Sequence, residues 1–227
     1  MNPLFLVWFF LLLQEPGRPA TPPEAEPPAA QPTPPATPAA AVQALKRALE
    51  SHDLAALAEL TQGNLAGPLR SLAGPFAKAR TASERLDQVI KDKPALAFTN
   101  PFAPSLQPFA QVRFEVLEVV QDQNQHVARI RFGRRGLPLA EEQLAIHADG
   151  NSWRLELPSD LRKQVESLIG EPALLQREQR ALDALATIFT TLATEIEKGQ
   201  LASKGDVVAR MLRLMDETKL SELYERP

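Results

Sequence analysis

The chain has 227 residues, a formal net charge of −3 and no cysteine. Most of that charge lies in the first forty residues, so the remainder is near neutral and lacks the broad basic field that holds a nucleic-acid backbone. The absence of cysteine excludes disulfides, thiolate nucleophiles, Cys-ligated zinc, iron–sulfur clusters and the lipid-attachment cysteine of a bacterial lipoprotein.

The amino terminus carries an export or anchor segment. Ten unbroken apolar residues run from Leu4 to Leu13, and as a helix they would span about 15 Å, half of the hydrocarbon core of a bilayer. That length is typical of a signal-peptide core, although Met1–Pro3 has no Lys or Arg and Gln14–Gly17 offers no small-x-small cleavage site. We expect residues 1–14 to be a signal peptide, or an uncleaved membrane anchor, of a periplasmic or secreted protein.

A proline-rich segment follows, with 10 prolines in the 23 residues from Pro16 to Pro38. Proline fixes φ and lacks an amide donor, which disfavours helix and sheet. We therefore expect residues 15–40 to be a disordered, extended tether, reaching up to roughly 70 Å at about 3.1 Å per residue. A passive spacer, a segment that holds the domain off a membrane, and a ligand for a polyproline-binding partner are the alternatives.

Helical periodicity begins at Ala41. The polar corner Ser51–Asp53 interrupts it, so we expect two short helices, the second capped by Asp53. Prolines are expected to break the following stretch into pieces, at Pro68 and Pro75.

A further helix is expected after these breaks. Thr81 and Glu84 have the spacing of a capping box that would open it. Lys93-Pro94 would end it, because the residue before a proline is disfavoured in helical conformation.

The pattern then changes to strands. Gln123-Asn124 and Asp149–Asn151 are expected turns between antiparallel neighbours. In the first strand the apolar face switches, which predicts a bulge or sharp bend near Glu115–Leu117. The expected strands are Val112–Val120, His126–Phe132, Gln143–Ala148 and Trp153–Leu157.

This order of elements resembles the nuclear transport factor 2-like superfamily. Members commonly start with a helix and a small-polar-Asp corner, matched by Ser51–Asp53, and end with a Gly-x-x-Trp-basic-apolar strand, matched by Gly150–Leu155. The resemblance covers residues 41–160 and implies a cone with a pocket between sheet and helices, without implying a reaction. Isomerase and cyclase members place an acid or base in the cone, often with a Tyr or Asp donor. The only tyrosine here, Tyr224, lies far from the sheet in sequence.

Residues 161–227 are expected to form a helical extension. An apolar stripe runs along Pro172 to Lys198, Gly199 ends it, and Ser203 and Asp206 can cap a second helix. The short loop predicts an antiparallel helical hairpin. Its stripe either packs within the chain or forms a partner or homodimer surface. The members of the stripe are Leu174, Leu175, Leu182, Leu185, Ile188, Phe189, Leu192 and Ile196.

Few residues indicate chemistry. His52, His126 and His147 are scattered and lack the i, i+4 spacing of a helical metal site. With the turn at Gln123-Asn124, Glu118 would lie opposite Arg129 as a cross-strand ion pair. His147, Glu118, Arg129 and Arg131 fit a solvated sheet face, while a polar ligand pocket and a catalytic site are the alternatives.

The sequence therefore predicts an α+β fold in which N-terminal helices pack on a curved, cone-like antiparallel sheet of three or four strands, followed by a C-terminal helical hairpin. We expect a non-enzymatic binding or scaffold domain of the cell envelope that binds an envelope protein or a small ligand. It would bind no nucleic acid and contact the membrane through its N-terminal segment. The alternative is an isomerase, cyclase or dehydratase using the cone pocket. No catalytic, cofactor-binding or metal residue is singled out.

Overall fold

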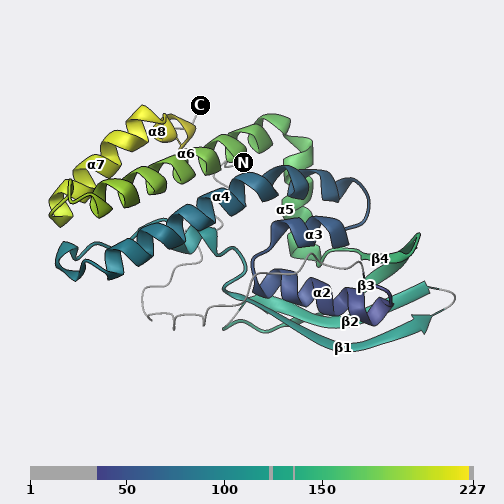
Figure 1. The fold of residues 1–227 in the computed structure, drawn as a ribbon. Helices are drawn as coiled ribbons and strands as arrows, with labels where there is room; N and C mark the ends of the chain where they lie inside the picture. The colour runs from purple at the N-terminus through teal and green to yellow at the C-terminus, as the bar shows by residue number, and fades with distance from the viewer. Residues whose placement is uncertain (1–34, 123–124, 135, 225–227) are drawn as a thin grey trace.

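The computed structural model describes residues 35–122, 125–134 and 136–224 (Figure 1). The expected export segment, most of the expected tether and the expected turn at Gln123-Asn124 lie outside the described residues. The fold is α+β, with helices on one face of a curled antiparallel sheet of four strands, which confirms the predicted class. Within the described ranges, no helix combines the length and the hydropathy that crossing a bilayer requires.

The first described helix, α2 (Pro38–Glu50), begins three residues before the periodicity that starts at Ala41. Thr37 caps it by accepting a hydrogen bond from the Ala40 amide at 3.1 Å, and Pro38 occupies the first turn, where a missing N–H costs nothing. The predicted second helix is α3 (Leu54–Leu60), and its Asp53 cap is confirmed by the bond from the Ala56 amide at 2.9 Å.

The third helix corrects the sequence interpretation. Instead of pieces broken at prolines, α4 (Ala66–Lys91) is one continuous helix with Pro75 inside it, and the expected capping box at Thr81 and Glu84 lies mid-helix. Pro75 cannot donate to the Ser71 carbonyl four residues earlier. That carbonyl instead accepts a hydrogen bond from the Gln179 side-chain amide at 3.1 Å. Helix α6 (Pro172–Glu197) thus provides the donor that Pro75 lacks.

The four strands neighbour one another in sequence order. Their bounds are β1 (Val112–Asp122), β2 (Gln125–Arg134), β3 (Ala140–Asp149) and β4 (Ser152–Leu155). The register of β1 on β2 shifts between Val116 and Glu118, which confirms the predicted bulge. The extra residue, Leu117, is 40% exposed, while Val119 returns to the helix-covered face opposite Ala128.

Helices follow the sheet to the end of the described chain. These are α5 (Ser159–Gly170), α6 (Pro172–Glu197), α7 (Lys204–Glu217) and α8 (Leu220–Tyr224). Single 3-10 turns occupy Gly63–Leu65, Pro94–Leu96 and Ala103–Leu106. The sequence interpretation missed α5, although Leu161, Val165 and Leu168 recur at i, i+4 and i+7, and all three are buried.

Helices α4 and α6 lie side by side and run in the same direction (Figure 1). Gln179 reaches Ser71 near their starts, and Arg85 pairs with Glu197 at 2.6 Å near their ends. Lys93 donates to the Ile196 carbonyl, which closes the end of α6. The apolar stripe of α6 packs within this chain: Phe189 is 0% exposed and its ring lies 6.2 Å from that of Phe102.

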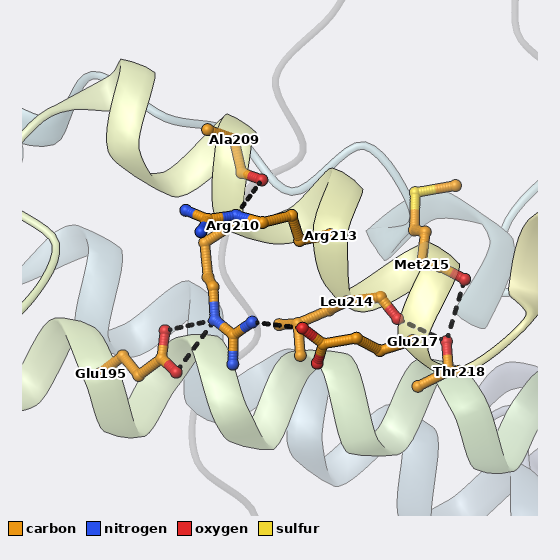
Figure 2. A network of polar contacts seen from close by, with 8 residues as sticks. All are labelled: Glu195, Ala209, Arg210, Arg213, Leu214, Met215, Glu217 and Thr218. Carbon is orange, nitrogen blue, oxygen red and sulfur yellow. Dashed lines mark hydrogen bonds and ion pairs between the residues drawn. The ribbon is translucent and has the colours of Figure 1, made fainter.

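Helix α7 lies along α6 and is joined to it by a polar network (Figure 2). Arg210 donates from Nε to both carboxylate oxygens of Glu195 at 3.0 Å, and from Nη1 to Glu217 at 2.9 Å. At the start of α7, the predicted capping box of Ser203 and Asp206 is confirmed. The pair of Arg210 with Glu195 joins α7 to α6, whereas the capping box and the bond to Glu217 stabilise α7 itself.

Candidate functional site

The helix-covered face of the sheet, where the resemblance implies a pocket, is filled by side chains. Ile130, Leu144 and Ile146 are at most 2% exposed. Leu45 and Leu49 of α2, which lies across the sheet in Figure 1, are buried to the same extent. The interior between α2 and the sheet is therefore a packed core.

The three histidines occupy separate places. His126 lies edge-on to Trp153, with ring centroids 4.9 Å apart, and His147 lies on the opposite face of the sheet beside Arg154. His52 holds the corner between α2 and α3 at φ +55°, where its Nδ1 accepts from the Phe109 amide at 3.1 Å. No group of three or more His, Asp or Glu side chains with metal-binding geometry occurs in the part of the chain that the structure describes.

His52 has a structural explanation. Burial, and then the charge of Arg80, lower its pKa from 6.5 to about 4. The imidazole is therefore neutral at pH 7, as its acceptor role at Nδ1 requires. The cleft beside it, between α2 and the start of β1, mixes opposite charges that pair with each other. Lys46 lies 3.8 Å from Glu50, and Arg113 2.7 Å from Glu115.

The polar face of the sheet is a solvated ion-pair array. The predicted pair of Glu118 with Arg129 is confirmed, both by register and by contact. Arg131 pairs with Glu141 at 2.9 Å. All four side chains are between 44% and 51% exposed, so water screens these pairs and the array encloses no ligand site.

A pocket lies on the other side of the molecule, among the helices. Its walls come from α3, α4, α5, α6 and the segment 105–109, and they are almost wholly apolar. Leucines dominate, and the ring of Phe76 contributes to the wall from α4. The pocket is partly enclosed and has a volume of about 70 Å³. Elements distant in sequence thus form one concave apolar surface.

One ionisable side chain lines this pocket. Glu178 occupies the buried face of α6, in register with Leu174, Ala181 and Leu185 at helical spacing, and it is 5% exposed. No described residue donates a hydrogen bond to its carboxylate, whose oxygens are not among the fully enclosed polar atoms and so open onto the pocket. A carboxylate at such a position costs free energy unless it is protonated or meets a donor.

Burial raises the pKa of Glu178 from 4.5 to about 7, and the nearby charge of Arg177 opposes that rise without cancelling it. The group therefore exchanges its proton close to neutral pH. A carboxyl poised in this way within a cleft is typical of functional sites, although ion-pair networks also perturb pKa values.

The other polar side chains of the pocket leave one donor available. The Ser105 hydroxyl donates to the Phe102 carbonyl at 2.6 Å, and the Ser167 hydroxyl donates to the Gln164 carbonyl at 2.7 Å. The side-chain amide of Gln164 makes no hydrogen bond with the described residues. A ligand in the pocket would therefore meet one carboxyl group, that of Glu178, and one side-chain amide, that of Gln164, on otherwise apolar walls.

Sequence reasoning predicted the apolar stripe that contains Leu185 but assigned no ligand-binding role to any residue of this pocket. The available signal was a glutamate in the apolar stripe of α6, four residues after Leu174 and three before Ala181. Comparison with known proteins gives no assignment, since the chain matches no protein-family model, no curated protein and no solved structure. The resemblance to the nuclear transport factor 2-like superfamily therefore stays a prediction.

Proposed function

We propose that this chain is a non-enzymatic binding domain of the cell envelope, and that its ligand site is the helical pocket around Glu178. In this proposal the segment Leu4–Leu13 directs export or anchors the chain, and the proline-rich tether separates the anchor from the domain. The domain is a nuclear transport factor 2-like cone with a filled interior. Its C-terminal helical hairpin, begun by α6, supplies the wall that carries Glu178.

One observation carries this proposal: a glutamate that is 5% exposed, and that accepts no hydrogen bond from the described residues, lines an apolar pocket. A domain that served only as a scaffold would be more stable with an apolar side chain at position 178, because burying a polar group without a partner costs free energy. A ligand that meets the carboxyl removes that cost when it binds. A glutamate at this position is therefore better explained by binding than by packing.

Filling the pocket tests the proposal. Ala181 is 3% exposed and lines the pocket, so Ala181→Met should occupy its volume, whereas Ala173→Met adds the same atoms at an exposed position of α6. Methyl NMR of the described domain, titrated with n-hexanol as a neutral apolar probe, should show saturable shifts at Leu168 and Leu182 in wild type and in Ala173→Met. The shifts should disappear in Ala181→Met. Equal shifts in all three proteins, or none in wild type, would refute the site.

A second function is favoured by the pKa of Glu178. With a pKa of about 7, this carboxyl suits a general base, and the Gln164 amide could donate to a developing oxyanion. In this alternative, the active site of an isomerase-type enzyme would be the helical pocket and not the interior of the cone, which side chains fill. Incubation with butanone in D₂O distinguishes the two functions: exchange of its α-protons that is lost in Glu178→Gln supports catalysis, and no exchange supports binding alone.

A further inference from the structure

The apolar pocket carries one carboxyl group, that of Glu178, and this group determines which ligands fit. Among the described residues, Glu178 is the only titratable side chain of its lining, since α3, α4, α5 and the segment 105–109 contribute apolar or uncharged groups. The charge that acts on it from outside the lining is that of Arg177 on the same helix. A ligand that enters with a positive group therefore meets a carboxylate for which the other residues of the lining provide no counter-charge.

We infer that the pocket binds a slender aliphatic amine, whose ammonium group pairs with the Glu178 carboxylate while its alkyl chain lies between the leucines of α4, α5 and α6. The inference rests on the binding function proposed above and names its ligand class. An ammonium group donates hydrogen bonds to the carboxylate and balances its charge. No described residue of the pocket lining donates a hydrogen bond to this carboxylate or carries a positive charge.

Other ligand classes fit less well. An aliphatic carboxylate or phosphate would place a second negative charge against Glu178. A divalent cation needs several oxygen ligands, and the described residues place no second carboxylate in the pocket lining. An alcohol can donate one hydrogen bond but leaves the charge unbalanced.

Binding of an ammonium ion is coupled to the proton on Glu178. Because its pKa is about 7, the carboxyl is roughly half protonated at pH 7, and the ammonium ligand selects the ionised form. Each bound amine should therefore release about half a proton at pH 7. The affinity should fall as the pH decreases from 8 to 5.5. A neutral alcohol should release no proton.

Isothermal titration calorimetry of n-hexylammonium and n-hexanol, at pH 7 in two buffers of different ionisation enthalpy, tests the inference. Wild type should bind n-hexylammonium at least tenfold more tightly than n-hexanol and release protons with the amine alone. Glu178→Gln should lose that preference and the proton release but still bind n-hexanol. Glu166→Gln, at an exposed position of α5, controls for the lost negative charge and should behave as wild type.

The outcomes separate the ligand class from the site. If n-hexanol binds as tightly as n-hexylammonium and Ala181→Met abolishes both, the pocket binds apolar ligands and the amine inference is wrong. If n-hexylammonium binds equally to Glu178→Gln, the inference is also wrong. If neither compound binds wild type, the proposed binding function fails, and the inference fails with it.

Discussion

At the scale of single residues, the fold changes the pKa of two buried groups in opposite directions. His52 has its pKa lowered to about 4, and Glu178 has its pKa raised to about 7, burial being the main cause for both. The folded state therefore favours the neutral form of each group. His52 contributes stability that is present above pH 6.5 and is lost as the pH falls towards 4. Glu178 contributes stability that is present below pH 4.5 and is lost as the pH rises through 7.

The substitution Glu178→Gln should isolate the pH-dependent contribution of Glu178 to stability. Between pH 4.5 and 7 the folded wild type binds more protons than the unfolded chain. Above pH 7, ionisation of the buried Glu178 carboxyl therefore lowers the free energy of unfolding by roughly 3 kcal/mol. Glutamine has no proton to lose. Its Tm advantage over wild type should grow from near zero at pH 4.5 to several degrees at pH 8, as measured by thermal melts. The contribution of His52 cancels because both proteins contain it.

The control is Glu166→Gln, which removes the same charge from the exposed face of α5. A Tm difference between Glu178→Gln and wild type that stays constant from pH 4.5 to 8 would contradict the assigned protonation.

The same scale shows what sequence reasoning can and cannot find. The pair of Glu118 with Arg129 was predictable because a turn position fixes the register of two antiparallel strands. Glu178 was not predicted, because its burial depends on α4 and α5, which approach α6 only in the folded chain.

At the scale of elements, α4 shows how tertiary contacts override a local signal. A proline inside a helix removes one hydrogen bond and predicts a break. Here Gln179 of α6 donates to the Ser71 carbonyl, and packing along the two helices keeps α4 continuous through Pro75. No local pattern identifies this partner, because it lies 108 positions away in sequence. By contrast, the caps Asp53 and Ser203 were predictable because they act within one helical turn.

A double-mutant cycle measures this compensation. Gln179→Ala should cost about 0.5–1.5 kcal/mol in urea unfolding, because it leaves the Ser71 carbonyl without that donor. In a Pro75→Ala background, the new backbone N–H can bond to the same carbonyl, so the cost of Gln179→Ala should fall by half or more. Gln176→Ala, at an exposed position of α6, should change stability by no more than about 0.5 kcal/mol in either background. Equal costs of Gln179→Ala in both backgrounds would refute the role assigned to Gln179.

At the scale of the whole molecule, the α+β class and a sheet of three or four antiparallel strands were predictable from composition, turn residues and alternation, and the structure has four strands. The pocket could not be predicted in this way, since its walls combine α3, the segment 105–109 and three further helices that are distant in sequence. Its position also explains why a family resemblance pointed elsewhere: the resemblance ends at residue 160, and the helices that complete the pocket begin at Ser159 and Pro172.

Placement of the domain outside the cytoplasm is a prediction that the sequence carries and that protease accessibility tests. In bacteria expressing the full chain, protease added to spheroplasts should cut within the proline-rich segment, since its composition disfavours protective structure. The stable product should begin close to Thr37, which caps the first described helix. A variant lacking residues 1–13 should remain in the cytoplasm and stay uncut until the cells are lysed, as should a cytoplasmic marker protein. Full-length chain that is protected in intact spheroplasts and cut at the same sites only after lysis would show that Leu4–Leu13 does not direct export.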